Sequence, residues 1–115
     1  DIDRSRGLGD VYKRQSAIRM LARIVDAVGH KTEVLFDSGI RSGQDVLKAI
    51  ALGAKGTMIG RAYTYGLGAR GEKGVLDALN IIFKELDTTM GLCGRTNIKD
   101  VDRNILLIPE DFNRE

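Results

Sequence analysis

The segment FDSGIRSGQDVLKAIALGAKGTMIGRA, residues 36–62, constrains the fold more than any other part of the chain. It holds two short apolar runs, each followed by glycine and arginine, with an amphipathic stretch of helical length between them. Strands that alternate with helices imply parallel pairing in an α/β architecture. The segment therefore predicts two parallel strands joined by a helix, as part of an α/β fold.

Apolar spacing extends this alternation along the chain. Apolar residues recur at three- and four-residue intervals over residues 18–28, which predicts a helix that ends at Gly29. Residues 33–36 predict a short buried strand, and residues 57–59 predict a second strand. The order of the predicted elements is helix, strand, helix, strand, helix.

The middle helix and the helices after it follow from the same periodicity. Ser42 and Asp45 resemble a capping box at the start of the middle helix, although the residue expected at the second position is Glu or Gln. We expect a short helix at residues 62–69, a longer one over residues 75–90 and a last apolar run at residues 105–108. The apolar face of the middle helix consists of Val46, Leu47, Ile50, Ala51 and Ala54.

Two strands do not complete a parallel sheet. Their outer edges would carry N–H and C=O groups that have no partner. The chain is therefore expected to be a piece of a larger fold.

Composition and charge narrow the class of protein. With 115 residues, 43% apolar and 30% charged, the chain reads as one small globular domain. No apolar stretch approaches the roughly 20 residues that a membrane-spanning helix needs. We expect a cytoplasmic protein without a transmembrane segment, and a peripheral position at a membrane stays open. The formal charge of +2 is spread along the chain, which argues against nucleic acid as a partner.

The first residues differ from the rest of the chain. The tract DIDRSRGLGDVYKRQ, residues 1–15, shows no apolar periodicity and resembles translated adapter sequence, with a flexible tail as the alternative. We therefore divide the chain into a foreign-looking or disordered segment at residues 1–15 and one folded part at residues 16–115.

Glycine and arginine at the strand ends point to an anion. In α/β folds the ligand lies at the carboxyl ends of the strands, so the segment 37–41 and the pair Gly60 and Arg61 are placed to face one ligand. Gly39 lets backbone N–H groups approach an anion, and the helix that starts near Gly43 adds its positive end. Arginine brings a planar fork of donors that suits phosphate oxygens. The pattern therefore predicts a phosphate site.

A plainer interpretation weighs against this site. A glycine followed by an arginine is a common loop composition, with the arginine in solvent and the glycine in a turn. Two such ends, separated by one strand-helix-strand unit, favour the site instead. Asp37 cannot attract a phosphate by its charge, so we expect it to hold backbone N–H groups or Arg41 in place.

Two stretches resemble one known family. They are DSGIRSGQDVLKAIALGAKGTMIGRAYTYGLGARGEKGV, residues 37–75, and ELDTTMGLCGRTNIKDV, residues 85–101. Both resemble the flavin-dependent α-hydroxy-acid dehydrogenases and oxidases, which include L-lactate dehydrogenase and glycolate oxidase. The resemblance implies the C-terminal part of a (β/α)8 TIM barrel, incomplete in this chain, from a homo-oligomeric parent protein that oxidises an L-2-hydroxy acid with FMN. The residues it implies for the FMN phosphate are Asp37, Ser38, Gly39, Ile40, Arg41, Gly60 and Arg61.

The catalytic residues of that family have no counterpart here. The family's base is a histidine in an H-G-G-R motif, whose expected place falls among residues 1–15, and the motif is missing. His30 lies between a predicted helix end and the next strand's start, so we interpret it as an ordinary loop residue. We therefore assign no catalytic residue and expect this chain to be inactive by itself.

Two alternatives stay open at this point. One is another phosphate-binding barrel, of the inosine-monophosphate dehydrogenase or isopentenyl-diphosphate isomerase type. The other is a non-catalytic interaction fragment, whose open sheet edges would pair with another chain.

Overall fold

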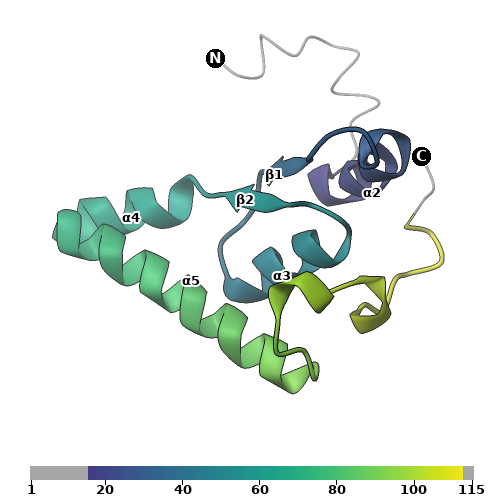
Figure 1. Ribbon diagram of the computed structural model, residues 1–115. Helices are drawn as coiled ribbons and strands as arrows, with labels where there is room; N and C mark the ends of the chain where they lie inside the picture. Colours follow the sequence, from purple (N-terminus) through teal and green to yellow (C-terminus); the bar gives the residue numbers. More distant parts are fainter. Residues whose placement is uncertain (1–15, 113–115) are drawn as a thin grey trace, which may run out of the picture.

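The computed structural model describes residues 16–112, so the predicted foreign segment at residues 1–15 lies outside the described part. Figure 1 shows the two strands in the middle of the molecule, with α4 and α5 extending away from them to the left. The expected order of helix, strand, helix, strand, helix is confirmed. The elements are α2 (Ala17–Val28), β1 (Leu35–Asp37), α3 (Gly43–Ala51), β2 (Gly56–Met58), α4 (Arg61–Arg70), α5 (Glu72–Leu92), η1 (Ile98–Asp100) and η2 (Arg103–Ile105).

The sheet consists of β1 and β2, which pair in parallel with Asp37 opposite Met58. The predicted parallel pairing, with α3 as the connection, is confirmed. Both strands are shifted by one or two residues from the predicted ranges 33–36 and 57–59. The shift arises because partners in the hydrogen-bonded ladder, and not the apolar runs, decide where a strand begins and ends.

Described residues cover only one face of this sheet. Phe36 is 6% exposed and packs with residues of α2 and α3, whereas Leu35 is 58% and Met58 is 48% exposed. The prediction that the first strand is buried is therefore wrong for Leu35. Parallel sheets are normally covered on both faces. The bare face is the one on which further elements of a larger fold would pack.

The crossover helix α3 belongs to both apolar clusters of the molecule. One cluster joins it to α2 and β1 and includes Leu21, Phe36 and Leu52. The other joins it to α5 and the C-terminal segment and includes Leu47 and Val101. Because α3 is held from both sides, the loop that leads into it has a defined position relative to the sheet.

Helices α4 and α5 form a hairpin whose corner is Gly71, with φ +64°. The two helices touch at Gly66 and Gly74, where a methyl group on either glycine would overlap the backbone of the other. The predicted helices at residues 62–69 and 75–90 are confirmed, and both extend further than their apolar spacing indicated.

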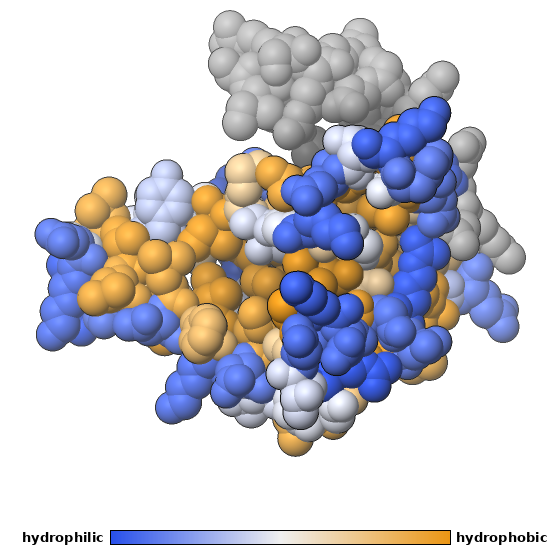
Figure 2. All heavy atoms as spheres, in the orientation of Figure 1, coloured by the Kyte–Doolittle hydropathy of each residue, from blue (hydrophilic) through white to orange (hydrophobic). Residues whose placement is uncertain are grey.

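Apolar side chains gather on this hairpin. In Figure 2 many apolar side chains lie on the left part of the molecule, where α4 and the start of α5 are, with hydrophilic side chains at its edge. Leu76 and Phe83 of α5 are 57% and 71% exposed. Among the helices in residues 16–112, none combines the length and the apolar character needed to cross a membrane. The hairpin therefore presents an apolar surface that has no cover from the described residues.

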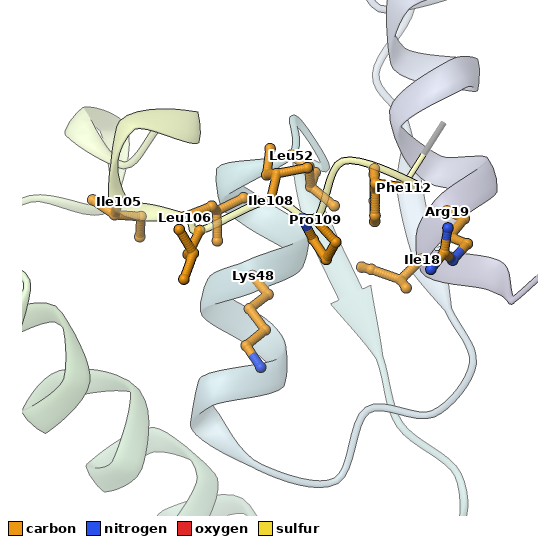
Figure 3. A pocket seen from close by; sticks show the side chains of 10 residues that line it. Ile18, Arg19, Lys48, Leu52, Ile105, Leu106, Ile108, Pro109 and Phe112 are labelled. Atoms are coloured by element: carbon orange, nitrogen blue, oxygen red, sulfur yellow. The ribbon is translucent and has the colours of Figure 1, made fainter. Parts of the chain in front are cut away.

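The C-terminal segment crosses from α3 to α2 and leaves a hollow of about 540 Å³ (Figure 3). Arg19 of α2 lines this hollow, donates a hydrogen bond of 2.7 Å to the backbone oxygen of Asp111, and lies 5.4 Å from the centre of the Phe112 ring. None of the predicted site residues lines it. Because its arginine is already engaged, we do not assign the predicted anion to this hollow.

Candidate anion-binding site at the strand ends

Both predicted loops leave the sheet at the same edge. Asp37 and Met58 are the last residues of the two strands and lie opposite each other in the parallel ladder. The loop after β1 leads to Arg41, and the shorter loop after β2 leads to Gly60 and Arg61. Adjacent strands lie about 4.8 Å apart. The two loops are therefore neighbours, which is the arrangement that the predicted site needs.

The loop after β1 begins with a strained turn and ends with a buried anchor. Ser38 and Gly39 have φ values of +136° and +75°, a region that side chains with a Cβ rarely adopt. Ile40 is 4% exposed and belongs to the apolar cluster around α2 and α3. The side chain of Ile40 therefore holds the loop, and only its backbone is available to a ligand.

The start of α3 is already capped by side chains. Ser42 Oγ accepts a hydrogen bond of 3.2 Å from Asp45 N, which confirms the predicted cap. The carboxylate of Asp45 accepts from Arg41 N at 3.0 Å, and Glu85 Oε1 accepts from Gly43 N at 3.1 Å. Two carboxylates thus face the positive end of this helix. These carboxylates oppose an anion at that end of the helix, and the expectation that α3 adds its positive end to the site stays a prediction.

The start of α4 is different. Gly60 occupies the N-cap position, and no side chain caps the helix there. A methyl group built on Gly60 or on Gly39 would meet no atom within 4 Å, so both loops are open in front of their backbone. Free N–H groups at a helix start are a ready site for an anion. The start of α4 is therefore open to an anion.

The two predicted arginines differ from the others in the described part of the chain. The guanidinium groups of Arg41 and Arg61 make no hydrogen bond or ion pair with residues 16–112, and both residues are exposed. Arg23 has a partner. The remaining arginines form ion pairs, namely Arg19 with Asp111, Arg70 with Asp77, Arg95 with Asp102 and Arg103 with Asp26.

Asp37 was expected to hold backbone N–H groups or Arg41 in place, and among the described residues it does neither. Its carboxylate is exposed and accepts no hydrogen bond from the described residues, whereas Asp45 accepts from the backbone of Arg41. The position of Asp45, four residues after Arg41, was interpreted only as part of a helix cap. Sequence reasoning also missed Glu85, because its partner Gly43 lies 42 residues away.

His30 lies in the exposed turn after α2, before β1 begins. This is the amino end of the strands, opposite the edge with the arginines. The interpretation of His30 as an ordinary loop residue is confirmed. Residues 16–112 also contain no group of three or more His, Cys, Asp or Glu side chains that could hold a metal ion.

Comparison with known proteins identifies the relatives of this chain. The family model of the FMN-dependent dehydrogenases matches residues 10–108. A pre-mycofactocin synthase of Mycolicibacterium smegmatis is 48% identical over 99 residues, which are 86% of this chain and 25% of that protein. An L-lactate dehydrogenase of Caulobacter vibrioides is 48% identical over 91 residues, 79% of this chain and 24% of the relative. An FMN-dependent alpha-hydroxy acid dehydrogenase of Schizosaccharomyces pombe is 47% identical over 100 residues, 87% of this chain and 22% of the relative.

Solved structures agree with these relatives. A soluble mutant of the membrane-associated (S)-mandelate dehydrogenase from Pseudomonas putida superposes with a TM-score of 0.74 at 40% identity, over 78% of this chain and 25% of the other. A mutant flavocytochrome b2 with benzoylformate gives a TM-score of 0.73 at 36% identity, over 80% of this chain and 25% of the other. The chain spans about a quarter of the length of the relatives it matches. It belongs to the FMN-dependent dehydrogenase family.

Proposed function

We propose that this chain is the C-terminal part of a (β/α)8 barrel and that its strand-end loops bind the phosphate of FMN. The parent protein would use this FMN to oxidise an L-2-hydroxy acid. The observation that carries this proposal is the pair Arg41 and Arg61. Both guanidinium groups lack a partner among residues 16–112, and both follow the ends of paired parallel strands. Two unpaired positive charges beside open backbone form a suitable site for a dianion.

The residues at the strand ends fit a phosphate group. Gly39 and Gly60 leave space in front of the backbone, and α4 offers its uncapped start to an anion. Arg41 and Arg61 would neutralise the charge, while Ile40 holds the first loop to the core. FMN, when bound, supplies the redox chemistry, and the protein orients it. The proposed set is Asp37, Ser38, Gly39, Ile40, Arg41, Gly60 and Arg61.

The substrate class rests on the relatives. Their names include L-lactate dehydrogenase, FMN-dependent alpha-hydroxy acid dehydrogenase and (S)-mandelate dehydrogenase, which supports a 2-hydroxy acid as substrate. One solved relative is described as a monotopic membrane protein, which supports a peripheral position of the parent at a membrane. A cytoplasmic location is the other proposal. We further propose that the parent is a homo-oligomer.

The two alternatives receive less support. The family match and the names of the relatives do not favour the inosine-monophosphate dehydrogenase or isopentenyl-diphosphate isomerase type. A non-catalytic interaction fragment would associate with itself without binding flavin. Size-exclusion chromatography combined with titration of FMN separates that function from the proposed one.

Substitution of the arginines tests the proposed site. In the parent protein, Arg41→Gln and Arg61→Gln should each weaken FMN binding by about 10- to 100-fold, the factor that a hydrogen bond to a charged group contributes. Binding of riboflavin, which lacks the phosphate, should stay within about twofold on the same scale. Quenching of flavin fluorescence measures both affinities.

The matched control is Arg70→Gln. Arg70 is the last residue of α4 and pairs with Asp77, so it lies at the opposite end of the helix from Arg61. This variant should bind FMN as the parent does. If Arg41→Gln and Arg61→Gln also bind FMN normally, the phosphate site lies elsewhere and the proposal is wrong.

A further inference from the structure

The carboxylate of Glu85 joins the two halves of the proposed site. Glu85 lies on α5, and its Oε1 accepts a partly buried hydrogen bond of 3.1 Å from Gly43 N. Gly43 is the first residue of α3, which follows the loop with Arg41, whereas α5 comes after the loop with Arg61. This single hydrogen bond therefore links the element behind one arginine to the element behind the other.

The contact between α3 and α5 leaves little freedom. Gly43 is buried, and a methyl group on it would overlap the backbone of Glu85 and Leu86. The two helices thus touch directly at this point. On the other side of Gly43, Asp45 holds the backbone N–H of Arg41 at 3.0 Å. The position of Arg41 is therefore tied to α5 through Gly43.

A second contact continues from α5 to the other arginine. Gly66 and Gly74 bring α4 and α5 together with no space for a side chain between them. Arg61 is the first residue of α4. A continuous path of close contacts thus runs from Arg41 to Arg61, and Glu85 is the polar link within it.

We propose that Glu85 is a positioning residue for the FMN phosphate, which it never touches. By holding the start of α3 against α5, it sets the separation of the two arginine loops. The inference rests on the proposed function above. The negative charge of Glu85 does not favour binding of an anion. Its contribution is instead the hydrogen bond that its oxygen accepts from Gly43 N. A site is accurate only when the residues behind it are themselves held in place.

Three substitutions at Glu85 separate the effect of its oxygen's position from the effect of its charge. Glu85→Gln keeps an oxygen at the same reach, and FMN affinity of the parent protein should stay within about threefold. Glu85→Asp keeps the charge but is one methylene too short, and Glu85→Leu has no acceptor. Both should weaken FMN binding by at least about tenfold, the factor for one hydrogen bond to a charged group. Their riboflavin affinity should stay within about twofold on the same scale, which a general loss of folding would not produce.

Asp87→Asn is the matched control, because Asp87 is an exposed carboxylate on the same helix without a hydrogen bond to the described residues. If Glu85→Leu does not fold, Glu85→Asp provides the comparison. Equal losses of FMN and riboflavin affinity, or an unchanged FMN affinity in Glu85→Asp, would overturn the positioning role. If Arg41→Gln and Arg61→Gln bind FMN normally, both the proposed phosphate site and the positioning role of Glu85 are wrong. If the arginine variants lose FMN affinity but the Glu85 variants keep it, only the positioning role is wrong.

Discussion

Single residues around the first loop divide into those that hold it and those that are open to a ligand. Ile40 inserts into the core, and Asp45 accepts from the backbone of Arg41. Ser38 adopts φ +136°, which is unfavourable for a residue with a side chain. Strained backbone of this kind occurs at binding sites, where the surrounding structure maintains it. The loop is thus kept in one conformation while its arginine stays exposed.

Replacing Ser38 by glycine should relieve this strain. We expect Ser38→Gly to raise the free energy of unfolding of the parent protein by about 1 kcal/mol, since strained φ values cost about 1–3 kcal/mol and glycine loses more backbone entropy on folding. Ser42→Ala removes the cap of α3 and should lower the same quantity by about 1 kcal/mol. Urea unfolding measures both, and a Ser38→Gly variant less stable than the parent contradicts this account.

At the scale of elements, glycines decide how closely the helices pack. Gly43 lets the start of α3 touch α5, and Gly66 with Gly74 lets α4 touch α5. Helices whose contact residues carry side chains pack 8–10 Å apart, so glycine at the contact allows a closer approach. Gly39 and Gly60 differ from these positions, because a methyl group there meets open space. Glycine therefore serves packing at the helix contacts and access at the strand ends.

Substitution by alanine distinguishes a glycine that allows helix packing from a glycine that leaves room for a ligand. Gly43→Ala should lower the free energy of unfolding of the parent protein by about 1–3 kcal/mol, because the added methyl overlaps α5. Gly60 has φ −129°, and a methyl group there meets open space. Gly60→Ala should therefore change the free energy of unfolding by less than about 0.5 kcal/mol. It should weaken FMN binding, because the methyl group stands in front of the backbone that the phosphate approaches. Urea unfolding and FMN titration test the pair. A Gly60→Ala variant with normal FMN affinity would remove Gly60 from the proposed site.

The molecule as a whole leaves large apolar surfaces without cover from its described residues. One face of the sheet exposes Leu35 and Met58, and the hairpin of α4 and α5 exposes Leu76 and Phe83. A parallel sheet of two strands with one bare face is not a complete fold. The chain also covers only about a quarter of its relatives. Both observations support the proposal that the chain is part of a barrel.

The chain alone should not turn over a 2-hydroxy acid. Its histidine, His30, lies at the amino end of the strands, away from the arginines, so it cannot take a proton from a substrate at the site. We expect the purified 115-residue chain, supplied with FMN, to reduce an artificial electron acceptor with L-lactate no faster than free FMN does. Turnover above that background would show that the chain contains a base which we have not identified.

The order of the elements could be predicted from sequence because it depends on local patterns. Apolar spacing of three and four residues placed α2, α3 and α5, and the alternation of strands and helices indicated parallel pairing. The strand bounds were less accurate, because the ladder between β1 and β2 sets them. The burial of Leu35 was predicted wrongly, because burial depends on which elements cover the sheet and not on the apolar run itself.

For the site, sequence alone determined that Arg41 and Arg61 follow the ends of two neighbouring strands. Only the tertiary structure decided what surrounds them. It showed that carboxylates face the start of α3, that no side chain caps the start of α4, and that Asp45, not Asp37, accepts from the backbone N–H of Arg41. It also brought Glu85 to Gly43 across 42 residues of chain. Local periodicity specifies which face of a helix is buried, but it carries no information on which distant residue that face will meet.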